Sequence, residues 1–164
     1  MTSSSSKPAE QRRILGIDPG SRSTGWGFIV AHGKRPRQCA FGCLRPPRGA
    51  DRPHTLATLA TGLEELLTEL APDVVVVETP FAARFPRAAL ALAEARGALL
   101  AALGRWGGTV IELEPARVKA LIVGHGSADK RQVAFIVQRE LGLGAQPPSD
   151  AADALALALC VLRS

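Results

Sequence analysis

Short apolar runs that end at turn residues alternate along this chain with longer segments of helical periodicity. Residues 14–17 form such a run, which ends at Asp18 and the turn Pro19-Gly20, so we expect a buried strand there. The four consecutive valines at 74–77 predict a strand that is buried on both faces, as in a parallel pair. The other expected strands are 23–30, 38–44 and 109–113.

Leucines at helical spacing predict an amphipathic helix over residues 54–70. The other expected helices are 88–103, 116–123 with Pro115 as its first residue, 127–141 with Ser127 as its cap, and 150–162. The inner face of the helix at 127–141 is expected to draw on Val133, Phe135, Ile136, Val137 and Leu141. The order of these elements predicts an α/β fold: a five-stranded mixed sheet, made of a three-strand antiparallel meander plus two parallel strands, flanked by helices.

The composition is that of one globular domain. The 164 residues, 46% of them hydrophobic, suffice for a single core, which we expect over residues 13–164 after a Ser-rich, disordered leader at 1–12. No apolar run reaches the roughly 18 residues of a membrane span, and no secretory signal is apparent at the N-terminus. An odd number of cysteines in apolar company favours reduced thiols and a cytoplasmic location. These are Cys39, Cys43 and Cys160.

The charge balance points to a polyanionic partner. The chain carries a formal net charge of +5 with a pI of about 9.7, and sixteen of its twenty basic residues are arginine. Arginine forks suit phosphate groups, so nucleic acid is the simplest partner. The alternative is compositional bias, because Ala, Arg, Gly and Pro are all frequent in this sequence.

Four carboxylates stand where the chain leaves buried structure. Asp18 and Glu78 each end an apolar strand, and Asp150 and Asp153 share one face at the start of an apolar helix. If the strands at 14–17 and 74–77 are neighbours, the first two acids emerge side by side at the carboxyl edge of the sheet, where ligands bind in such folds. Such a cluster requires a counter-charge, and Mg²⁺ or Mn²⁺ suits oxygen ligands. Two ions about 4 Å apart would clamp an in-line phosphoryl displacement.

Each of these acids also has a simpler interpretation. Asp150 is well placed to cap its helix, with Asp153 in the first turn, and either acid would favour the helix dipole there. Asp18 could pair with an arginine, and Glu78 could follow the valines by chance. The set of four is therefore more specific than any one member.

Two lysines and one aromatic residue are candidates for DNA contact. Lys130 is placed near the start of the helix at 127–141, where a cation opposes the helix dipole, so it is a candidate for meeting a phosphate. Lys119 is a candidate for a second phosphate contact, and Phe81, three residues after Glu78, for stacking on or wedging between bases. The alternatives are a solvated charge for Lys130 and a core position for Phe81.

Several segments together resemble the RuvC family of bacterial Holliday-junction resolvases. Residues 14–21 (ILGIDPGS), followed by Thr24-Gly25, resemble its first motif, and Val77-Glu78 with Phe81 resemble its second. Residues 150–156 (DAADALA) match its last motif almost letter for letter. The intermediate segments that resemble the family are 95–97 (ARG), 123–124 (VG) and 126–130 (GSADK) with Val133. The likeness extends, in order, over about residues 14–160.

This resemblance implies a ribonuclease-H-like nuclease that cuts four-way junction DNA as a homodimer with Mg²⁺, two ions per site, and works with a branch-migration helicase complex. Carried over by position, the catalytic and metal-binding acids are Asp18, Glu78, Asp150 and Asp153, with Lys130 as a further catalytic residue. The implied DNA contacts are Phe81, Lys119, Lys130 and Arg84.

The chain departs from the family pattern in the segment after Phe81. Arg84-Phe85 stands where Lys-Asn is usual, Ala88 replaces a hydroxyl residue, and Glu94 replaces Gln. These changes bear on where the enzyme cuts, because this segment is expected to lie near the site.

The leading hypothesis from the sequence is a junction-selective, metal-dependent DNA endonuclease that leaves 5′-phosphate and 3′-hydroxyl ends. The alternatives are an RNA-processing nuclease of the same fold, a non-catalytic junction-binding protein, and an actin-like or sugar-kinase-like ATPase. The last of these needs two such domains, and this chain is long enough for one.

Overall fold

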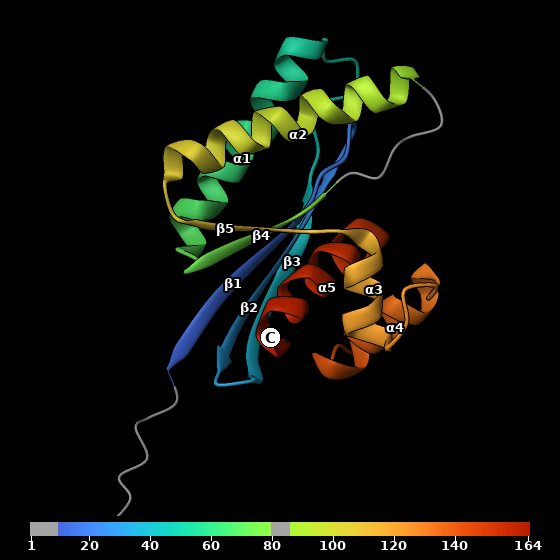
Figure 1. The fold of residues 1–164 in the computed structure, drawn as a ribbon. Coiled ribbons are helices and arrows are strands. Elements are labelled where there is room, and N and C mark those ends of the chain that lie inside the picture. Colours follow the sequence, from blue (N-terminus) through green and yellow to red (C-terminus); the bar gives the residue numbers. More distant parts are fainter. Residues whose placement is uncertain (1–9, 80–85) are drawn as a thin grey trace, which may run out of the picture.

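A single mixed sheet forms the centre of the molecule in the computed structural model, which describes residues 10–79 and 86–164 (Figure 1). Its strand order is β3-β2-β1-β4-β5, so the first strand of the chain lies in the middle. The strands are β1 (Gln11–Asp18), β2 (Thr24–His32), β3 (Arg35–Leu44), β4 (Val74–Glu78) and β5 (Thr109–Leu113). Strands β1 to β3 are antiparallel, and β1, β4 and β5 are parallel. The predicted meander plus two parallel strands is confirmed.

Helices cover both faces of the sheet. They are α1 (Arg52–Leu70), α2 (Pro86–Trp106), α3 (Pro115–Val123), α4 (Lys130–Glu140) and α5 (Ser149–Arg163). Figure 1 shows α1 and α2 on one face and α3, α4 and α5 on the other. The valines of β4 alternate between the two cores, Val75 and Val77 toward α1 and α2, Val74 and Val76 toward α5, as a doubly covered parallel strand requires.

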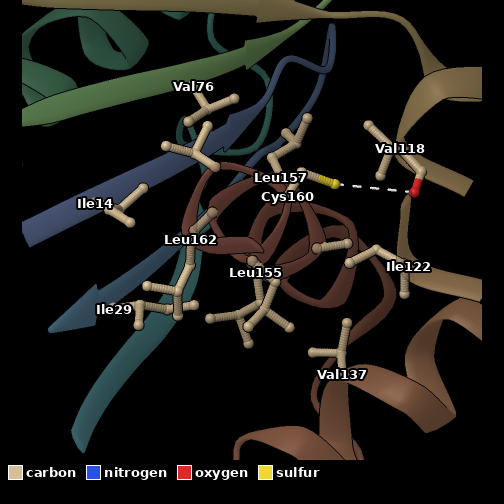
Figure 2. Close-up of a cluster of buried hydrophobic side chains, with 14 of the residues drawn as sticks. Ile14, Ile29, Val76, Val118, Ile122, Val137, Leu155, Leu157, Cys160 and Leu162 are labelled. Atoms are coloured by element: carbon tan, nitrogen blue, oxygen red, sulfur yellow. Dashed lines mark hydrogen bonds between the residues drawn. The ribbon is translucent and has the colours of Figure 1, made fainter. Parts of the chain in front are cut away.

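Helix α5 is the most deeply buried helix, and it lies directly against the backbone of β1 and β2. A Cβ atom on Gly16 would lie 1.9 Å from the carbonyl oxygen of Ala154, and one on Gly25 would lie 2.0 Å from that of Asp150. Side chains longer than hydrogen at these positions would therefore push the helix away from the sheet. Figure 2 shows the core that surrounds α5, where the thiol of Cys160 donates to the carbonyl oxygen of Val118.

Three expectations from the sequence need correction. Strand β1 begins at Gln11, so residues 11 and 12 belong to the sheet and not to a leader; they pair through the backbone with β2, which requires no apolar side chain. The cap of α4 is Asp129 and not Ser127, because Asp129 and Gln132 form a reciprocal capping box. Phe135 is 57% exposed, since the inner face of α4 consists of Val133, Ala134 and Val137. The remainder of the predicted leader, residues 1–9, lies outside the described residues.

Across residues 10–79 and 86–164, none of the helices combines the length and the apolar character that a membrane crossing demands.

Candidate active site

Asp18 and Glu78 lie side by side at the carboxyl edge of the sheet, as the sequence predicts. The parallel register of β1 and β4 pairs Ile17 with Val77, so the next residue of each strand is one of these acids. Both acids line a hollow of about 250 Å³, which they share with side chains from α3, α4 and α5. The strands therefore provide two carboxylates at the edge where ligands bind in such sheets.

Asp153 brings a third carboxylate into the same hollow from α5. Its side chain is 19% exposed and accepts a hydrogen bond at 2.8 Å from the Nζ atom of Lys130, whose side chain is 72% exposed. Lys119 of α3 also lines the hollow. Three elements from the C-terminal half of the chain thus bring one acid and two cations to the two strand-end acids.

Asp150 faces the site from a different side. It lies one turn before Asp153 on α5, and together with Asp18 it lines a neighbouring hollow formed by the turn at residues 19–23. The hydroxyl of Ser23 donates to its carboxylate at 2.6 Å. Asp150 is not the cap of α5, because the cap position is Pro148. The interpretation of Asp150 as a simple helix cap is therefore wrong.

The grouped negative charges alter the acid–base behaviour of the site. Burial raises the pKa of Asp18 to about 8, and the charges of Glu78, Asp153 and Asp150 add to this shift. Burial and the charge of Asp153 also raise the pKa of Glu78. The hydrogen bond to Asp153 raises the pKa of Lys130, which stays charged. The site therefore holds more negative charge than its own lysines offset.

The donor set suits a hard divalent cation. Four carboxylates from β1, β4 and α5 offer only oxygen ligands, which is the chemistry that Mg²⁺ and Mn²⁺ prefer. In the structure, Asp153 pairs with Lys130, and Asp150 accepts a hydrogen bond from Ser23. Within the described ranges, no three His, Cys, Asp or Glu side chains are close enough together to bind one metal ion. The raised pKa of Asp18 is nevertheless the effect expected where a cation would relieve carboxylate repulsion.

Lys130 occupies a different helical position from the one expected. It is the first residue of α4, directly after the Asp129 cap, where its amine lies near three site acids and pairs with one. The sequence signal, a cation at the start of a helix, is correct, but the cap of the helix lies two residues later than predicted. Phe81 and Arg84 lie outside the described residues, so their expected DNA contacts stay predictions.

Two contacts near the site were not expected from the sequence. Ser23 orients Asp150, although nothing in its sequence neighbourhood marks it. Glu94, one of the departures from the family pattern inferred from the sequence, pairs with Arg52 at 2.6 Å, and Arg52 also donates to the backbone oxygen of Ser21. The acid at position 94 thus has a partner in α1. The sequence alone does not show that Glu94 faces Arg52, because this pairing depends on how α1 packs on α2.

Comparison with known proteins agrees with this arrangement. The sequence profile described as "Crossover junction endodeoxyribonuclease RuvC" matches residues 14–161, nearly all of the chain. The chain belongs to the RuvC family. It is 48% identical over 150 residues to the crossover junction endodeoxyribonuclease RuvC of Alkalilimnicola ehrlichii, a match that covers 92% of this chain and 90% of that relative.

Solved RuvC structures share the fold. The structure of Thermus thermophilus RuvC superimposes with a TM-score of 0.81 at 33% identity, covering 90% of this chain and 92% of that one. The same protein in complex with a Holliday junction substrate gives a TM-score of 0.84 at 32% identity, with 91% and 92% covered. The ribonuclease-H-like fold expected from the sequence is therefore confirmed for this RuvC-family chain.

Proposed function

We propose that this chain resolves Holliday junctions by paired, symmetric nicks during DNA recombination and repair. The reaction is metal-dependent hydrolysis of a phosphodiester, which leaves 5′-phosphate and 3′-hydroxyl ends. One observation carries the proposal: Asp18, Glu78 and Asp153 line one hollow with two lysines in a chain of the RuvC family. Support also comes from a relative of closely similar structure, which has been solved with a Holliday junction substrate.

In this proposal the four acids hold the metal, and the lysines meet the substrate. Asp18 has the central position, since its pKa responds to the charges of the other three acids. Glu78 and the pair Asp150 and Asp153 complete the set. A divalent ion bound there, Mg²⁺ and alternatively Mn²⁺, would offset the carboxylate charge and polarise the phosphodiester. We propose two ions per site.

Lys130 is the residue proposed to stabilise charge that develops on the scissile phosphate. Its exposed amine stands at the mouth of the carboxylate hollow, where an incoming phosphate would compete with Asp153 for it. Lys119, on the α3 side of the hollow, is proposed to hold the same strand through its phosphates. Phe81 and Arg84 are kept as proposed DNA contacts on the family resemblance alone.

We further propose that the active form is a homodimer and that a branch-migration helicase complex is its partner. A two-fold dimer presents two equivalent sites, which accounts for paired cuts. The proposed interface is the solvent face of α2, where alanines permit close approach and the side chain of Leu90 is 63% exposed. Light scattering and cross-linking test this part, and a monomer with full paired cutting would contradict it.

The experiment that tests the function is cleavage of a synthetic four-way junction with Mg²⁺ or with EDTA. The cut sites and the product ends are mapped on all strands, and a linear duplex of the same sequence is the control. We expect symmetric nicks in two strands with Mg²⁺, and none with EDTA or on the duplex. Binding without nicking would favour the non-catalytic alternative, and preferred cutting of RNA or an RNA–DNA hybrid would favour an RNA-processing nuclease.

A further inference from the structure

A basic hollow adjoins the carboxylate site on the side away from the two lysines. It encloses about 460 Å³ between the turn at residues 19–23 and the loop at 45–50, and Arg22 and Arg48 are among its lining residues. It shares Ser21 and Arg22 with the hollow next to Asp150, which in turn shares Asp18 with the carboxylate hollow. The three hollows thus follow one another along the same edge of the sheet.

Arg52 also lines this basic hollow and connects the segments around it. Its guanidinium pairs with Glu94 and donates to the backbone oxygens of Ser21 and Ala91, so it joins the β1–β2 turn, the start of α1 and the middle of α2. The side chain is 32% exposed, and its charge is already offset by Glu94. Arg52 therefore fixes the shape of the hollow but has little free charge to offer a ligand.

Arg22 and Arg48 differ from Arg52 because both are exposed and have no acidic partner. Among residues 10–79 and 86–164 neither makes an ion pair, and the remaining segments, 1–9 and 80–85, contain no Asp or Glu. Arginine forks with no partner, at the wall of a concave site, suit the oxygens of a phosphate. The basic hollow therefore has the chemistry of an anion site.

A DNA strand that reaches the four acids must cross a region of negative charge. Lys119 and Lys130 offset this charge on one side of Asp18, and Arg22 with Arg48 stand on the other side. Cations on both flanks lower the repulsion between the carboxylates and the backbone phosphates that pass over them. They also fix the register of the strand, because phosphate contacts set position without selecting sequence.

We propose that Arg22 and Arg48 bind a backbone phosphate of the strand that is cut, on the opposite side of the scissile phosphate from Lys119 and Lys130. The proposal rests on the proposed nuclease function and adds the path of the strand through the site. The two arginines bind the DNA strand and fix its position relative to the site acids. Their loss is therefore expected to weaken junction binding more than it slows cleavage of bound junction.

The test measures the salt dependence of junction binding in an Asp18→Asn background, so that no strand is cut. Arg22→Ala and Arg48→Ala are compared with Arg35→Ala, which removes an equally exposed charge at the far end of the sheet, where β3 begins beside the end of β2. Each lost phosphate contact lowers the magnitude of the slope of log K against log salt by about 0.9. In the proposed homodimer each test variant alters the contact in both subunits, so we expect the slope to fall in magnitude by up to about 1.8 for Arg22→Ala and Arg48→Ala and to stay unchanged for Arg35→Ala.

A second measurement locates the contact on the DNA. Neutral methylphosphonate linkages are placed singly along the strand to be cut, on each side of the scissile position. One linkage on the proposed side should weaken binding to the parent protein and have no further effect on the double variant Arg22→Ala/Arg48→Ala. For both arginine variants, measured with an intact Asp18, the junction concentration for half-maximal single-turnover cleavage should rise by a larger factor than the maximal rate falls.

The outcomes separate this inference from the function itself. If the wild-type chain neither binds nor cuts the junction, the proposed function fails. If it does both, but the slopes of Arg22→Ala and Arg48→Ala equal that of Arg35→Ala, the function stands and the phosphate site is wrong. If binding is unchanged and only the cleavage rate falls, the arginines act on the site acids and not on the strand, which also overturns the proposal.

Discussion

The two faces of the sheet are packed in different ways. Against one face, α1 and α2 place large side chains such as Leu59, Leu63 and Leu99, all fully buried, between helix and sheet. Against the other, α5 rests on glycines, and its backbone comes within contact distance of β1 and β2. Both faces bury apolar side chains, and the second also brings the helix that carries Asp150 and Asp153 up to the strand that carries Asp18.

Because of this difference, mutations on the two faces should affect different properties: the free energy of folding on one face and the positions of the site acids on the other. A layer of side chains can relax when one of them is shortened, so such changes mainly cost folding free energy. Where the backbone of α5 lies directly on a glycine, no side chain stands between helix and strand that could change its rotamer. An added methyl group must therefore move the helix itself. We therefore expect mutations on the α5 face to affect cleavage and mutations on the α1/α2 face to affect stability.

The largest effect is expected for Gly25→Ala. Its Cβ atom would lie 2.0 Å from the carbonyl oxygen of Asp150, so the first turn of α5 must shift and the acids lose their relative positions. A misplacement of about 1 Å is enough to lower a rate about 100-fold. Single-turnover cleavage of a four-way junction measures the loss. The matched control is Gly144→Ala in the exposed loop between α4 and α5, where the new Cβ would meet no atom within 4 Å beyond its chain neighbours; its cleavage should be unchanged. Equal loss in both variants would contradict the comparison.

Leu59→Ala tests the other face. Leu59 is fully buried among α1, α2 and the sheet, so its truncation should lower the free energy of unfolding by about 2–5 kcal/mol. Denaturant unfolding measures this cost. Cleavage per folded molecule, well below the melting temperature, should stay close to wild type. A variant that keeps its stability but loses cleavage would show that this face also shapes the site. Leu59→Met, which keeps the volume, should cost less than about 1.5 kcal/mol.

Ser23→Ala should have a smaller effect, confined to the metal requirement. The variant removes the hydrogen bond that orients Asp150 but leaves every carboxylate in place. Loss of such a supporting contact weakens metal affinity about tenfold at the low end of its usual range. The Mg²⁺ concentration for half-maximal cleavage, and a Mg²⁺ titration followed by thermal shift, measure this change. Ser23→Thr keeps the hydroxyl and should restore affinity; if it behaves like Ser23→Ala, the hydrogen bond is not the cause.

The most gradual effect is the pH dependence of the metal-free protein. Because the pKa of Asp18 is raised from 3.8 to about 8, the folded chain keeps a proton that the unfolded chain releases between these values. Stability from this group is therefore fully present below pH 3.8 and is lost as the pH rises through about 8. Thermal melts in EDTA should show this decline, and Asp18→Asn should reduce it to the part that the raised pKa of Glu78 contributes.

Mg²⁺ should counteract this decline. Metal competes with the proton for the carboxylates, so the increase in melting temperature on adding Mg²⁺ should grow as the pH rises through about 8. The same increase at every pH would show that Asp18 does not hold the metal. The pH series therefore checks the assignment of Asp18 without relying on cleavage.

The sequence predicted the central part of the site because that part depends on topology. An apolar strand followed by an acid, met twice in strands that pair in parallel, is enough to place Asp18 beside Glu78. The i, i+3 spacing likewise placed Asp150 and Asp153 within one turn of α5, although the two side chains line neighbouring hollows. These inferences needed only strand order and helical periodicity.

Contacts between distant segments were less accessible. The bond from Ser23 to Asp150 joins residues 127 positions apart, and a serine in a turn gives no sign of it. The glycines of β1 and β2 carry no local sign of their role in seating α5, because that role depends on packing. Phe135 was assigned to the core from its apolar character, although α4 buries a narrower stripe. The local sequence pattern does not predict such contacts or exposures, because they depend on tertiary packing.

The most direct test of the central claim, a four-carboxylate nuclease site centred on Asp18, is Asp18→Asn assayed for both junction cleavage and junction binding. The substitution keeps the size of the side chain and removes the carboxylate that is proposed to bind metal in the hollow. We predict that cleavage with Mg²⁺ is abolished, while binding to the four-way junction in EDTA is as tight as that of wild type or tighter. Cleavage at the wild-type rate by the purified variant would contradict the account.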